Sequence, residues 1–341
     1  MTQSLEPIVP EEAVEQYLKS RRQDASKSTI QNHRYRLKHF LKWCDQTSIE
    51  NLNKLSGRDC ENYKNWRIAQ GKIADITLEQ QLRTFRVFLR YCESIEAIEP
   101  GIADKLIVPN VSKGVAVRDD AITHEEACAI CEHLQKYEYA SKEHVIFSLL
   151  YHTGMRRGAS VSLDVADWHS EDKYVEVQHR PDASISTPLK LKREGERNLS
   201  ILDADLSESI DDYISFNRIP HTEPDGREPL FTTSSGRISG NAVQYIVYKL
   251  TRPCYYGKNC PHNRDIETCE ATETAGYSSC PSSVSPHPIR RSAIMHHLNS
   301  DVSKSIASER MAVSVDTLEE HYDARSREDK RKARQSELRL L

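Results

Sequence analysis

The sequence predicts a mainly α-helical protein with one small β-hairpin or sheet, an α+β fold, divided into two domains. Its 341 residues are enough for two domains that each bury a hydrophobic core. Apolar residues recur at helical spacing over most of the chain and alternate convincingly only between Tyr174 and Ile201. A stretch with Pro and Gly but no sustained periodicity separates the two halves. We therefore expect an N-terminal domain at 1–100, a linker at 101–121 and a second domain at 122–341.

The N-terminal domain is expected to be a bundle of four amphipathic helices. One apolar face contains Leu37, Phe40 and Leu41, which recur at helical spacing. Ser56 and Asp59 can cap the N-terminus of the third helix. The four helices are predicted at residues 11–24, 26–47, 57–70 and 77–96. Such a bundle is compatible with many ligands, so periodicity alone assigns it no function.

The second domain is expected to open with a capped helix in the segment THEEACAICEHL, from Thr123 to Leu134. The segments KYVEVQHR and LKLKREGERNLSI follow, and their alternation around a turn at Gly195 predicts a β-hairpin. Helices should resume at Ser207–Phe216, Ser239–Leu250, Pro288–Asn299, Lys304–Met311 and Asp316–Ala324. A final short helix is expected at Asp329–Leu341, within the tail at residues 325–341.

The net charge of the chain is −4, but its basic residues are segregated. Between Gln16 and Trp43 there are eight Lys and Arg residues and a single acid, Asp24. A basic face of this kind suits the phosphate backbone of a nucleic acid, although a charge run is more often a solvated helix face. The residues expected to contact nucleic acid in this region are Arg21, Arg22, Lys27, Arg34 and Lys38.

Neither a signal sequence nor a membrane span is expected. The first residues, MTQSLEPIVP, lack the basic start and the apolar run of a secretory signal. The longest apolar stretch, Val145 to Tyr151, is too short to cross a bilayer. We therefore expect a soluble, cytoplasmic protein that does not bind a membrane.

Five separated residues form the strongest chemical pattern in the chain. Two arginines, a lysine and a histidine provide cationic hydrogen-bond donors, and a late tyrosine provides a nucleophile. An attacked phosphodiester gathers negative charge that guanidinium groups neutralise, and its leaving oxygen needs a proton from a lysine or histidine. These residues are Arg156, Lys192, His287, Arg290 and Tyr322. Each alone is most often an ordinary surface or core residue, whereas together they predict cleavage of a nucleic-acid backbone without water.

At these residues the chain resembles the tyrosine recombinase family (phage integrases, Xer-like), and in particular its halophilic archaeal members. TGMR followed by SLDVADW is similar to the first arginine box of that family, HPIRRS to its HxxR box and EEHYD to its nucleophile segment. Lys192 and Arg197 in KREGERNLSI resemble the β-hairpin lysine of the family and the strand that follows it. The helical N-terminal half resembles the four-helix core-binding domain of the family.

The resemblance implies a tyrosine-recombinase catalytic domain and site-specific recombination of double-stranded DNA. Tyr322 would form a covalent 3′-phosphotyrosyl link, Arg156 and Arg290 would bind the phosphate, Lys192 would protonate the leaving 5′-oxygen and His287 would assist proton transfer. Arg197 would contact DNA. No cofactor is implied for catalysis. Dimers would assemble into a tetramer on DNA, with the C-terminal tail either docked on a neighbouring subunit or solvated.

Three residues depart from the family pattern. Ala159 stands where the family usually has glutamate, and Val313 stands where it usually has histidine or tryptophan, preceded by Ala312 in place of glycine. These changes favour one alternative, a DNA-binding relative without catalytic activity. A second alternative, a type IB topoisomerase, shares a similar site but is disfavoured by the helical N-terminal domain and the tail.

The adjacent arginines leave a question of register. The resemblance to the family, whose boxes read TG-x-R and H-x-x-R, favours Arg156 over Arg157 and Arg290 over Arg291.

A cysteine-rich insert at residues 252–283 predicts a structural zinc site. Four cysteines lie there in a polar segment, separated by five, eight and ten residues: Cys254, Cys260, Cys269 and Cys280. His262 could replace one of them, and the alternative is a loop of unliganded thiols. Cys128 and Cys131 form a CxxC pair, but their apolar helical face favours core packing.

Overall fold

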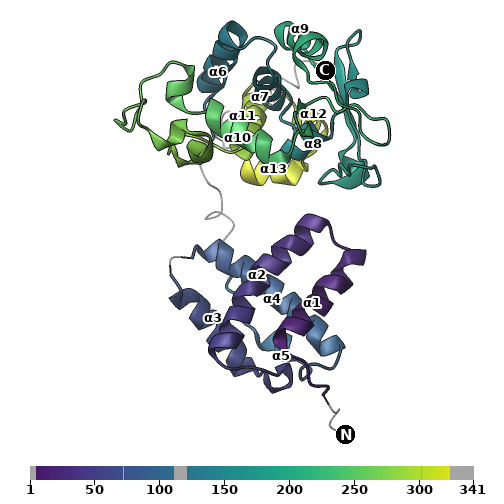
Figure 1. Cartoon of the computed structure of the whole chain (residues 1–341), viewed down its shortest axis with the longest axis vertical. Coiled ribbons are helices and arrows are strands. Elements are labelled where there is room, and N and C mark those ends of the chain that lie inside the picture. Colours follow the sequence, from purple (N-terminus) through teal and green to yellow (C-terminus); the bar gives the residue numbers. More distant parts are fainter. Residues whose placement is uncertain (1–4, 72, 111–120, 301, 323–341) are drawn as a thin grey trace. The chain divides into compact units, whose positions relative to one another are not determined.

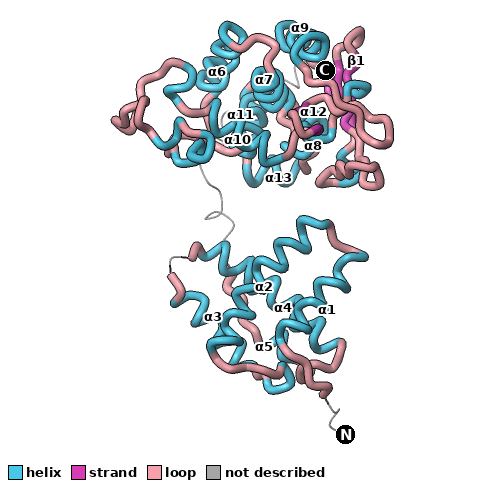
Figure 2. Tube along the Cα trace, viewed as in Figure 1, coloured by secondary structure: helices cyan, strands magenta, loops and turns pink. Residues whose placement is uncertain are grey.

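The computed structural model describes residues 5–71, 73–110, 121–300 and 302–322 of the chain. The chain divides into two compact units, Met1–Arg118 and Asp119–Leu341 (Figure 1). Most of the regular structure is helical, and the short strands lie in the second unit (Figure 2), which confirms the predicted α+β class. In these described ranges every helix is too short or too polar to cross a bilayer. The tail at 325–341 lies outside the described residues.

The first unit contains the four predicted helices, with ends that differ from the prediction by a few residues. The helices are α1 (Pro10–Ser20), α2 (Lys27–Gln46), α3 (Gly57–Ala69), α4 (Asp75–Ser94) and the short α5 (Ile102–Lys105), with single turns η1 (Arg21–Gln23) and η2 (Leu52–Lys54). The predicted cap of α3 is confirmed, because the side chain of Ser56 accepts the N–H of Asp59 while the Asp59 carboxylate accepts the N–H of Ser56.

An aromatic core holds these helices together. Phe40 of α2 and Phe85 of α4 are fully buried, with ring centroids 4.6 Å apart. Ile102 and Leu106 are buried in the same core. The beginning of the predicted linker therefore packs as part of the first unit, because its apolar side chains have a place in that core.

The second unit contains eight described helices, several short helical turns and five short strands. Its helices are α6 (His124–Tyr137), α7 (Lys142–Thr153), α8 (Arg157–Ser162), α9 (Ala204–Asp212), α10 (Gly240–Leu250), α11 (Pro286–Asn299), α12 (Lys304–Met311) and α13 (Val315–His321). Single helical turns are η4 (Val165–Asp167), η5 (Lys192–Gly195), η6 (Tyr213–Asn217), η7 (Pro253–Tyr256), η8 (Glu270–Thr272) and η9 (Thr274–Ser279). The strands are β1 (Trp168–His169), β2 (Tyr174–Val177), β3 (Arg197–Ser200), β4 (Thr232–Thr233) and β5 (Gly236–Arg237).

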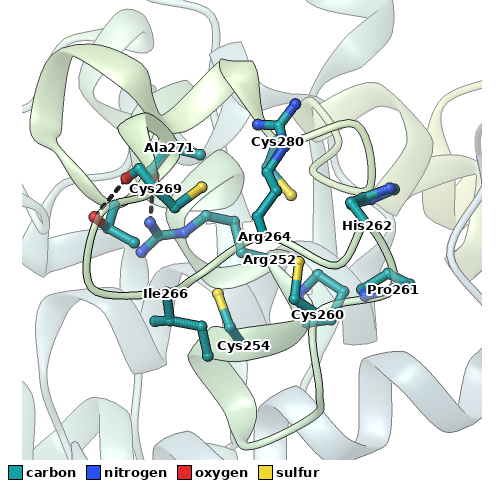
Figure 3. A pocket seen from close by; sticks show the side chains of 12 residues that line it. Arg252, Cys254, Cys260, Pro261, His262, Arg264, Ile266, Cys269, Ala271 and Cys280 are labelled. Atoms are coloured by element: carbon teal, nitrogen blue, oxygen red, sulfur yellow. Dashed lines mark hydrogen bonds between the residues drawn. The ribbon is translucent and has the colours of Figure 1, made fainter.

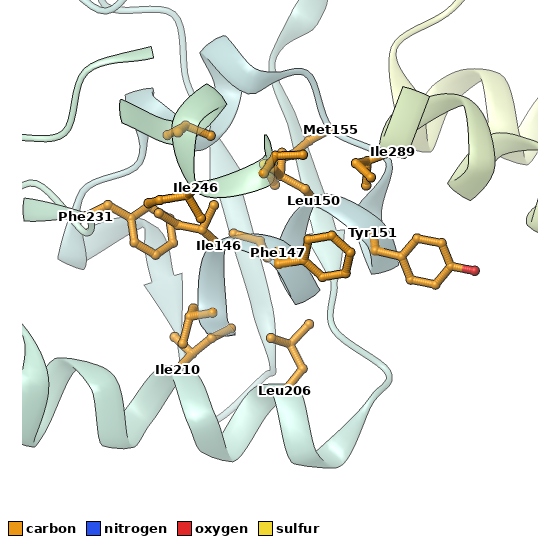
Figure 4. Close-up of a cluster of buried hydrophobic side chains, with 14 of the residues drawn as sticks. Ile146, Phe147, Leu150, Tyr151, Met155, Leu206, Ile210, Phe231, Ile246 and Ile289 are labelled. Atoms are coloured by element: carbon orange, nitrogen blue, oxygen red, sulfur yellow. The ribbon is translucent and has the colours of Figure 1, made fainter. Parts of the chain in front are cut away.

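Helix α7 lies at the centre of this unit. Ile146, Phe147 and Leu150 are at most 1% exposed, and apolar side chains from α9, α10 and α11 surround them (Figure 4). No helix is predicted for this segment from the sequence. The reason is that a helix buried on nearly all sides has no polar face, so its sequence lacks the amphipathic period by which a helix is recognised.

The predicted β-hairpin is only partly correct. Strands β2 and β3 pair antiparallel, with Val175 opposite Leu199, and β1 extends the sheet on the far side of β2. However, the chain does not turn directly from one alternating strand to the other at Gly195. Leu189 instead enters the core at 7% exposed, and Lys192 adopts a left-handed conformation with φ 53°. The segment LKLK is therefore a loop and a helical turn that precede β3.

A buried ion-pair network supports the loops beside this sheet. Asp164 is 3% exposed and lies 2.5 Å from Arg237, 3.3 Å from Arg227 and 3.5 Å from Arg180. Glu223, also 3% exposed, pairs with Arg237 at 2.6 Å. Each of these buried charges therefore has an opposite charge beside it, which is what burial of a charge requires.

We expect the substitution Asp164→Asn to destabilise the second unit by about 3–5 kcal/mol, because it leaves buried guanidinium groups without full compensation. The matched control is Glu319→Gln, which removes an exposed ion pair with Lys304 and should cost about 1 kcal/mol or less. Chemical denaturation of the full chain measures both. Equal effects of the two substitutions would contradict the structural role of the network.

Candidate active site

The site begins at a sharp turn at the end of α7. Gly154 ends that helix with φ 60°, and an added Cβ there would lie 3.0 Å from Met311. Thr153 supports the turn, since its hydroxyl accepts the N–H of Met155. Arg156 follows in an extended conformation as the N-cap of α8. The glycine of the TG-x-R string is therefore needed for backbone conformation and for space, and it directs the chain into the site.

Arg290 is the buried centre of the site. It lies on α11, is 3% exposed and donates from Nη1 to the carbonyl oxygen of Gly154 at 2.7 Å. Its guanidinium also forms a side-chain hydrogen bond with Tyr322. Burial lowers the pKa of Arg290, the charge of Arg156 lowers it further, and Tyr322 opposes both effects. The two predicted arginines and the predicted tyrosine are thus brought together.

Arg156 reaches the corner between α12 and α13. Its Nη1 donates to the carbonyl oxygen of Ala312 at 2.7 Å. Ala312 ends α12 in a left-handed conformation, φ 48°, which costs a residue with a Cβ about 1 kcal/mol. Val313 follows, 7% exposed, with its carbonyl oxygen accepting from Ser308 at 2.6 Å. The corner therefore presents a backbone carbonyl to Arg156 and an apolar side chain where the family usually has a hydrogen-bond donor.

Tyr322 ends α13 and is 9% exposed. Its ring packs in a small apolar cluster with Met311, Val313 and Leu318. Its oxygen is close enough to Arg156 to raise the pKa of that arginine, against the larger lowering effect of burial. The hydroxyl therefore lies in a cationic field while the ring is held by packing, an arrangement that suits a positioned nucleophile.

Two further arginines join this group. Arg197 of β3 donates from Nε to the carbonyl oxygen of Arg310 at 2.7 Å, and Arg310 of α12 donates to the carbonyl oxygen of Ser200 at 3.0 Å. Burial and the charges of Arg156 and Arg310 lower the pKa of Arg197 to about 10. Arg197 is among the residues predicted from the sequence, whereas Arg310 is not and is identified only by its position in the fold.

The four arginines (Arg156, Arg197, Arg290 and Arg310) have no acidic partner among the residues described. Their guanidinium groups are bonded instead to backbone carbonyl oxygens and to the tyrosine. Carbonyl oxygens satisfy donors without neutralising their charge. The site therefore retains a concentrated positive charge and is suited to bind an anion.

His287 lies in the first turn of α11, with an exposed side chain beside the arginines. Desolvation lowers its pKa from the ordinary value of 6.5, and the charges of Arg290 and Arg156 lower it further. At neutral pH the ring is therefore uncharged and can accept or relay a proton.

Lys192 is not brought into this group. It is exposed, on the wall of an open hollow formed by residues 179–183 and 190–194. Arg157, the neighbour of Arg156, donates to Gln244 of α10 and does not take part in the group around the tyrosine. This agrees with the choice of Arg156 over Arg157.

The basic residues predicted to bind DNA in the first unit lie along η1 and α2. Arg22, Lys27 and Lys38 are exposed. Arg21 pairs with Asp24 at 2.5 Å, and Arg34 forms two hydrogen bonds to Glu15. Glu15 lies one position before the stretch that the sequence analysis counts as basic, so the basic face is partly neutralised from α1.

The four cysteines of the insert surround one small pocket (Figure 3). As placed, no three His, Cys, Asp or Glu side chains in the described part of the chain are close enough together to hold a metal ion. The predicted zinc site therefore remains a proposal.

Comparison with known proteins identifies the family. The sequence profile of the phage integrase N-terminal SAM-like domain matches residues 14–94. The N-terminal domain of a phage integrase/site-specific recombinase from Haloarcula marismortui is 30% identical to this chain, over 30% of this chain and 99% of its own, with a TM-score of 0.30. The chain belongs to the phage integrase (tyrosine recombinase) family. No curated protein matches it significantly.

Other integrase structures share the fold of the whole chain. The Tn1549 transposon integrase, in complex with a circular intermediate DNA, is 14% identical over 97% of this chain and 99% of its own, with a TM-score of 0.66. A lambda integrase dimer bound to a core site is 13% identical over 94% of this chain and 79% of its own, with a TM-score of 0.61. At this level of identity the likeness shows that the integrase fold is common to all three.

We expect inorganic phosphate to stabilise the second unit, because it supplies the missing counter-charge. At constant ionic strength, replacing chloride by phosphate should raise the thermal midpoint by about 2–4 °C for each kcal/mol of binding free energy. The shift should disappear in Arg156→Gln and persist in Arg21→Gln, whose guanidinium already pairs with Asp24. A shift that is equal in both variants would show that the arginine group is not the binding site.

We expect the ring of His287 to titrate below pH 6.5 in the free protein. A bound phosphate should move this titration upward, because the anion offsets the neighbouring positive charges. Nitrogen-detected NMR of the histidine rings, with His287→Gln used for assignment, measures both values. Titration at or above pH 6.5 without phosphate would contradict the position of the ring beside the arginines.

Proposed function

We propose that this integrase is a site-specific DNA recombinase that cleaves and rejoins DNA through a covalent bond at Tyr322. One observation carries the proposal. Arg156 and Arg290, from two distant motif strings, converge on the hydroxyl of Tyr322 and have no acidic partner in the described residues. A cationic pocket around a nucleophile is suited to an attacked phosphodiester, and it serves little purpose in a passive scaffold.

The reaction exchanges one phosphodiester for another. The Tyr322 oxygen attacks the scissile phosphorus and loses its proton, and the 5′-oxygen leaves and gains one. A 3′-phosphotyrosyl link results, and a second DNA strand reverses the step with its own 5′-hydroxyl. The energy of the original bond is kept, so neither ATP nor a cofactor is needed. Arg156 and Arg290 stabilise the charge on the non-bridging oxygens, and uncharged His287 accepts or relays the nucleophile's proton.

Lys192 is proposed as the acid that protonates the leaving 5′-oxygen. Its exposure on the loop before β3 means that bound DNA must bring the two together, either by contacting the hollow beside it or by shifting the loop. Arg310 supports this arrangement, since it ties α12 to the carbonyl oxygen of Ser200 at the end of β3. Through this bond, a movement of the β-hairpin would also move α12 and the turn after it, which contains Val313.

Double-stranded DNA is the proposed substrate, with recombination sites bound by dimers that pair into a tetramer. Exposed basic residues on η1 and α2, among them Arg22, Lys27 and Lys38, provide phosphate contacts for the first unit. The related Tn1549 integrase is described with circular intermediate DNA and the lambda integrase as a dimer on a core site, which supports the DNA substrate and the dimer but says nothing of the tetramer. A cytoplasmic location is consistent with such a substrate.

A second candidate is a DNA-binding integrase without catalytic activity. It is favoured by one specific observation, the apolar side chain of Val313 packed beside Tyr322. With valine there, a donor to the phosphate is missing, and the carbonyl of Ala312 occupies Arg156. Arg197 and Arg310 bring two further guanidinium groups close by, which can supply the missing donor and favour the enzyme.

We expect wild-type protein to form a denaturation-resistant adduct with a nicked duplex that carries its own recombination site, because the nick traps the covalent intermediate. Tyr322→Phe should bind the duplex equally well without forming the adduct. Tyr245→Phe, which alters an exposed tyrosine of α10, is the matched control and should react normally. A denaturing gel measures the adduct and a mobility shift measures binding. DNA binding by the wild type without any adduct would favour the non-catalytic candidate.

We expect Arg290→Gln to slow adduct formation by roughly 10²–10³-fold, the usual cost of removing one donor to a developing oxyanion. Val313→His tests the missing hydrogen-bond donor to the phosphate. The substitution should accelerate adduct formation if no other group supplies that donor, and it should leave the rate unchanged if Arg197 or Arg310 does. The rate constants of single-turnover reactions distinguish these results. Unchanged rates in Arg290→Gln would contradict the proposed role of the arginine group.

A further inference from the structure

The insert between α10 and α11 has little hydrophobic core of its own. Apart from Tyr256, Ala271 and Cys280, its described apolar side chains are not buried, and Ile266 is 48% exposed. Its regular structure consists of short 3₁₀ segments, η7, η8 and η9. Small segments without a core are usually stabilised by a cross-link or a metal ion. The fold of the insert therefore calls for an additional interaction.

The four thiols of the insert meet at one place. Cys254, Cys260, Cys269 and Cys280 all line the same pocket, and in Figure 3 their sulfur atoms point toward a common space. The electrostatic contacts agree with this view. Burial raises the pKa of the Cys254 thiol, and the proximity of Cys260 and Cys280 raises it further. All four are free thiols.

Three of the cysteines also share a local geometry. The carbonyl oxygen of Cys260 accepts the N–H of Asn263 at 3.3 Å, and that of Cys269 accepts the N–H of Thr272 at 2.9 Å. Cys280 does the same with Ser283 at 3.0 Å. Each of these cysteines therefore begins a tight turn, and each lines the pocket. Repetition of one turn around one pocket indicates a built site rather than a chance gathering of thiols.

We propose that Cys254, Cys260, Cys269 and Cys280 bind one structural Zn²⁺ ion in tetrahedral geometry. A closed site of four thiolates has no open position, so the metal would not take part in DNA cleavage. On binding, each thiol loses its proton to solvent and the sulfur atoms draw in to about 2.3 Å from the metal. The present spacing of the thiols is wider, so side-chain rotation and small shifts of the turns accompany binding.

His262 is not part of this ligand set. Its Nε2 is hydrogen-bonded to the hydroxyl of Ser282 at 2.7 Å, and its ring points away from the sulfur atoms in Figure 3. The Cys260 sulfur, two positions earlier, faces the pocket. The structure therefore favours four cysteines over three cysteines and a histidine, an alternative that the sequence leaves open.

The surrounding charges suit a metal–thiolate centre. Four thiolates and one Zn²⁺ carry a net charge of −2, and both Arg252 and Arg264 line the pocket. Arg252 is 6% exposed and is held in place by the carbonyl oxygen of Ala271 and by the ring of Tyr277, 4.9 Å away. Two arginines thus compensate the charge that the centre would introduce.

The metal would brace the start of α11. The insert returns to the second unit where the N–H of Val284 donates to the hydroxyl of Thr251 at 2.9 Å, and α11 begins two residues later. That helix carries His287 and Arg290. A cross-linked insert would hold its first turn in position, so zinc acts on the active site by positioning.

The full-length chain, purified under reducing conditions, tests the proposal by metal analysis. We expect one zinc ion per chain in the wild type. Cys254→Ser and Cys280→Ser should each lower the bound zinc at least tenfold after dialysis against a weak chelator. Cys128→Ser, a partly exposed thiol on α6, is the matched control and should retain the ion, as should His262→Gln.

Cobalt provides a second measurement that does not depend on the stability of the variants. Wild-type protein loaded with Co²⁺ should show intense visible bands of tetrahedral coordination and strong thiolate charge-transfer absorption. Absence of zinc from reduced wild-type protein, together with an octahedral cobalt spectrum, would overturn the proposal. Loss of zinc from His262→Gln would overturn the ligand set. Neither measurement depends on recombinase activity.

Discussion

The buried guanidinium of Arg290 is the interaction on which the candidate site depends. From α11 it reaches the carbonyl oxygen of Gly154 at the end of α7 and the hydroxyl of Tyr322 at the end of α13. A charged group inside a protein must be hydrogen-bonded, so these three elements are held to one geometry. Because both partners are uncharged, Arg290 joins the elements while its positive charge is not neutralised. The side chain of Arg290 thus both holds the three helix ends together and contributes to the positive potential of the site.

The same unit contains arginines of two kinds. One kind forms ion pairs that support loops, and its charge is neutralised by Asp164 or Glu223: Arg180, Arg227 and Arg237. Arg290 is buried and Arg156 is half-buried beside carbonyl oxygens instead, and this desolvation lowers the pKa of both arginines. Proteins tolerate such uncompensated charge where a ligand supplies the opposite charge. The presence or absence of an acidic partner therefore distinguishes the structural arginines from those of the candidate site, and no comparison with a related protein is needed.

The features that sequence analysis misses have a common physical origin. Helix α7 is buried all round, so it lacks the amphipathic period that reveals other helices. Arg310 belongs to no motif, and only the pairing of α12 with β3 brings it to Arg197. The segment before β3 alternates like a strand, yet burial of Leu189 turns it into a loop that leaves Lys192 exposed. In each case long-range packing overrides a local pattern.

Local sequence patterns were sufficient to predict the α+β class, the four helices of the first unit, the capping of α3 and the two arginines beside Tyr322, Arg156 and Arg290. These features depend on local spacing, on capping chemistry and on motifs that can be recognised without knowledge of the fold. Three outcomes came from the folded chain alone: Arg310 joins the arginine group, Lys192 lies apart from it, and four thiols share one pocket. Those outcomes depend on contacts between residues far apart in the chain, and no local pattern encodes the direction in which a side chain points once the helices have packed.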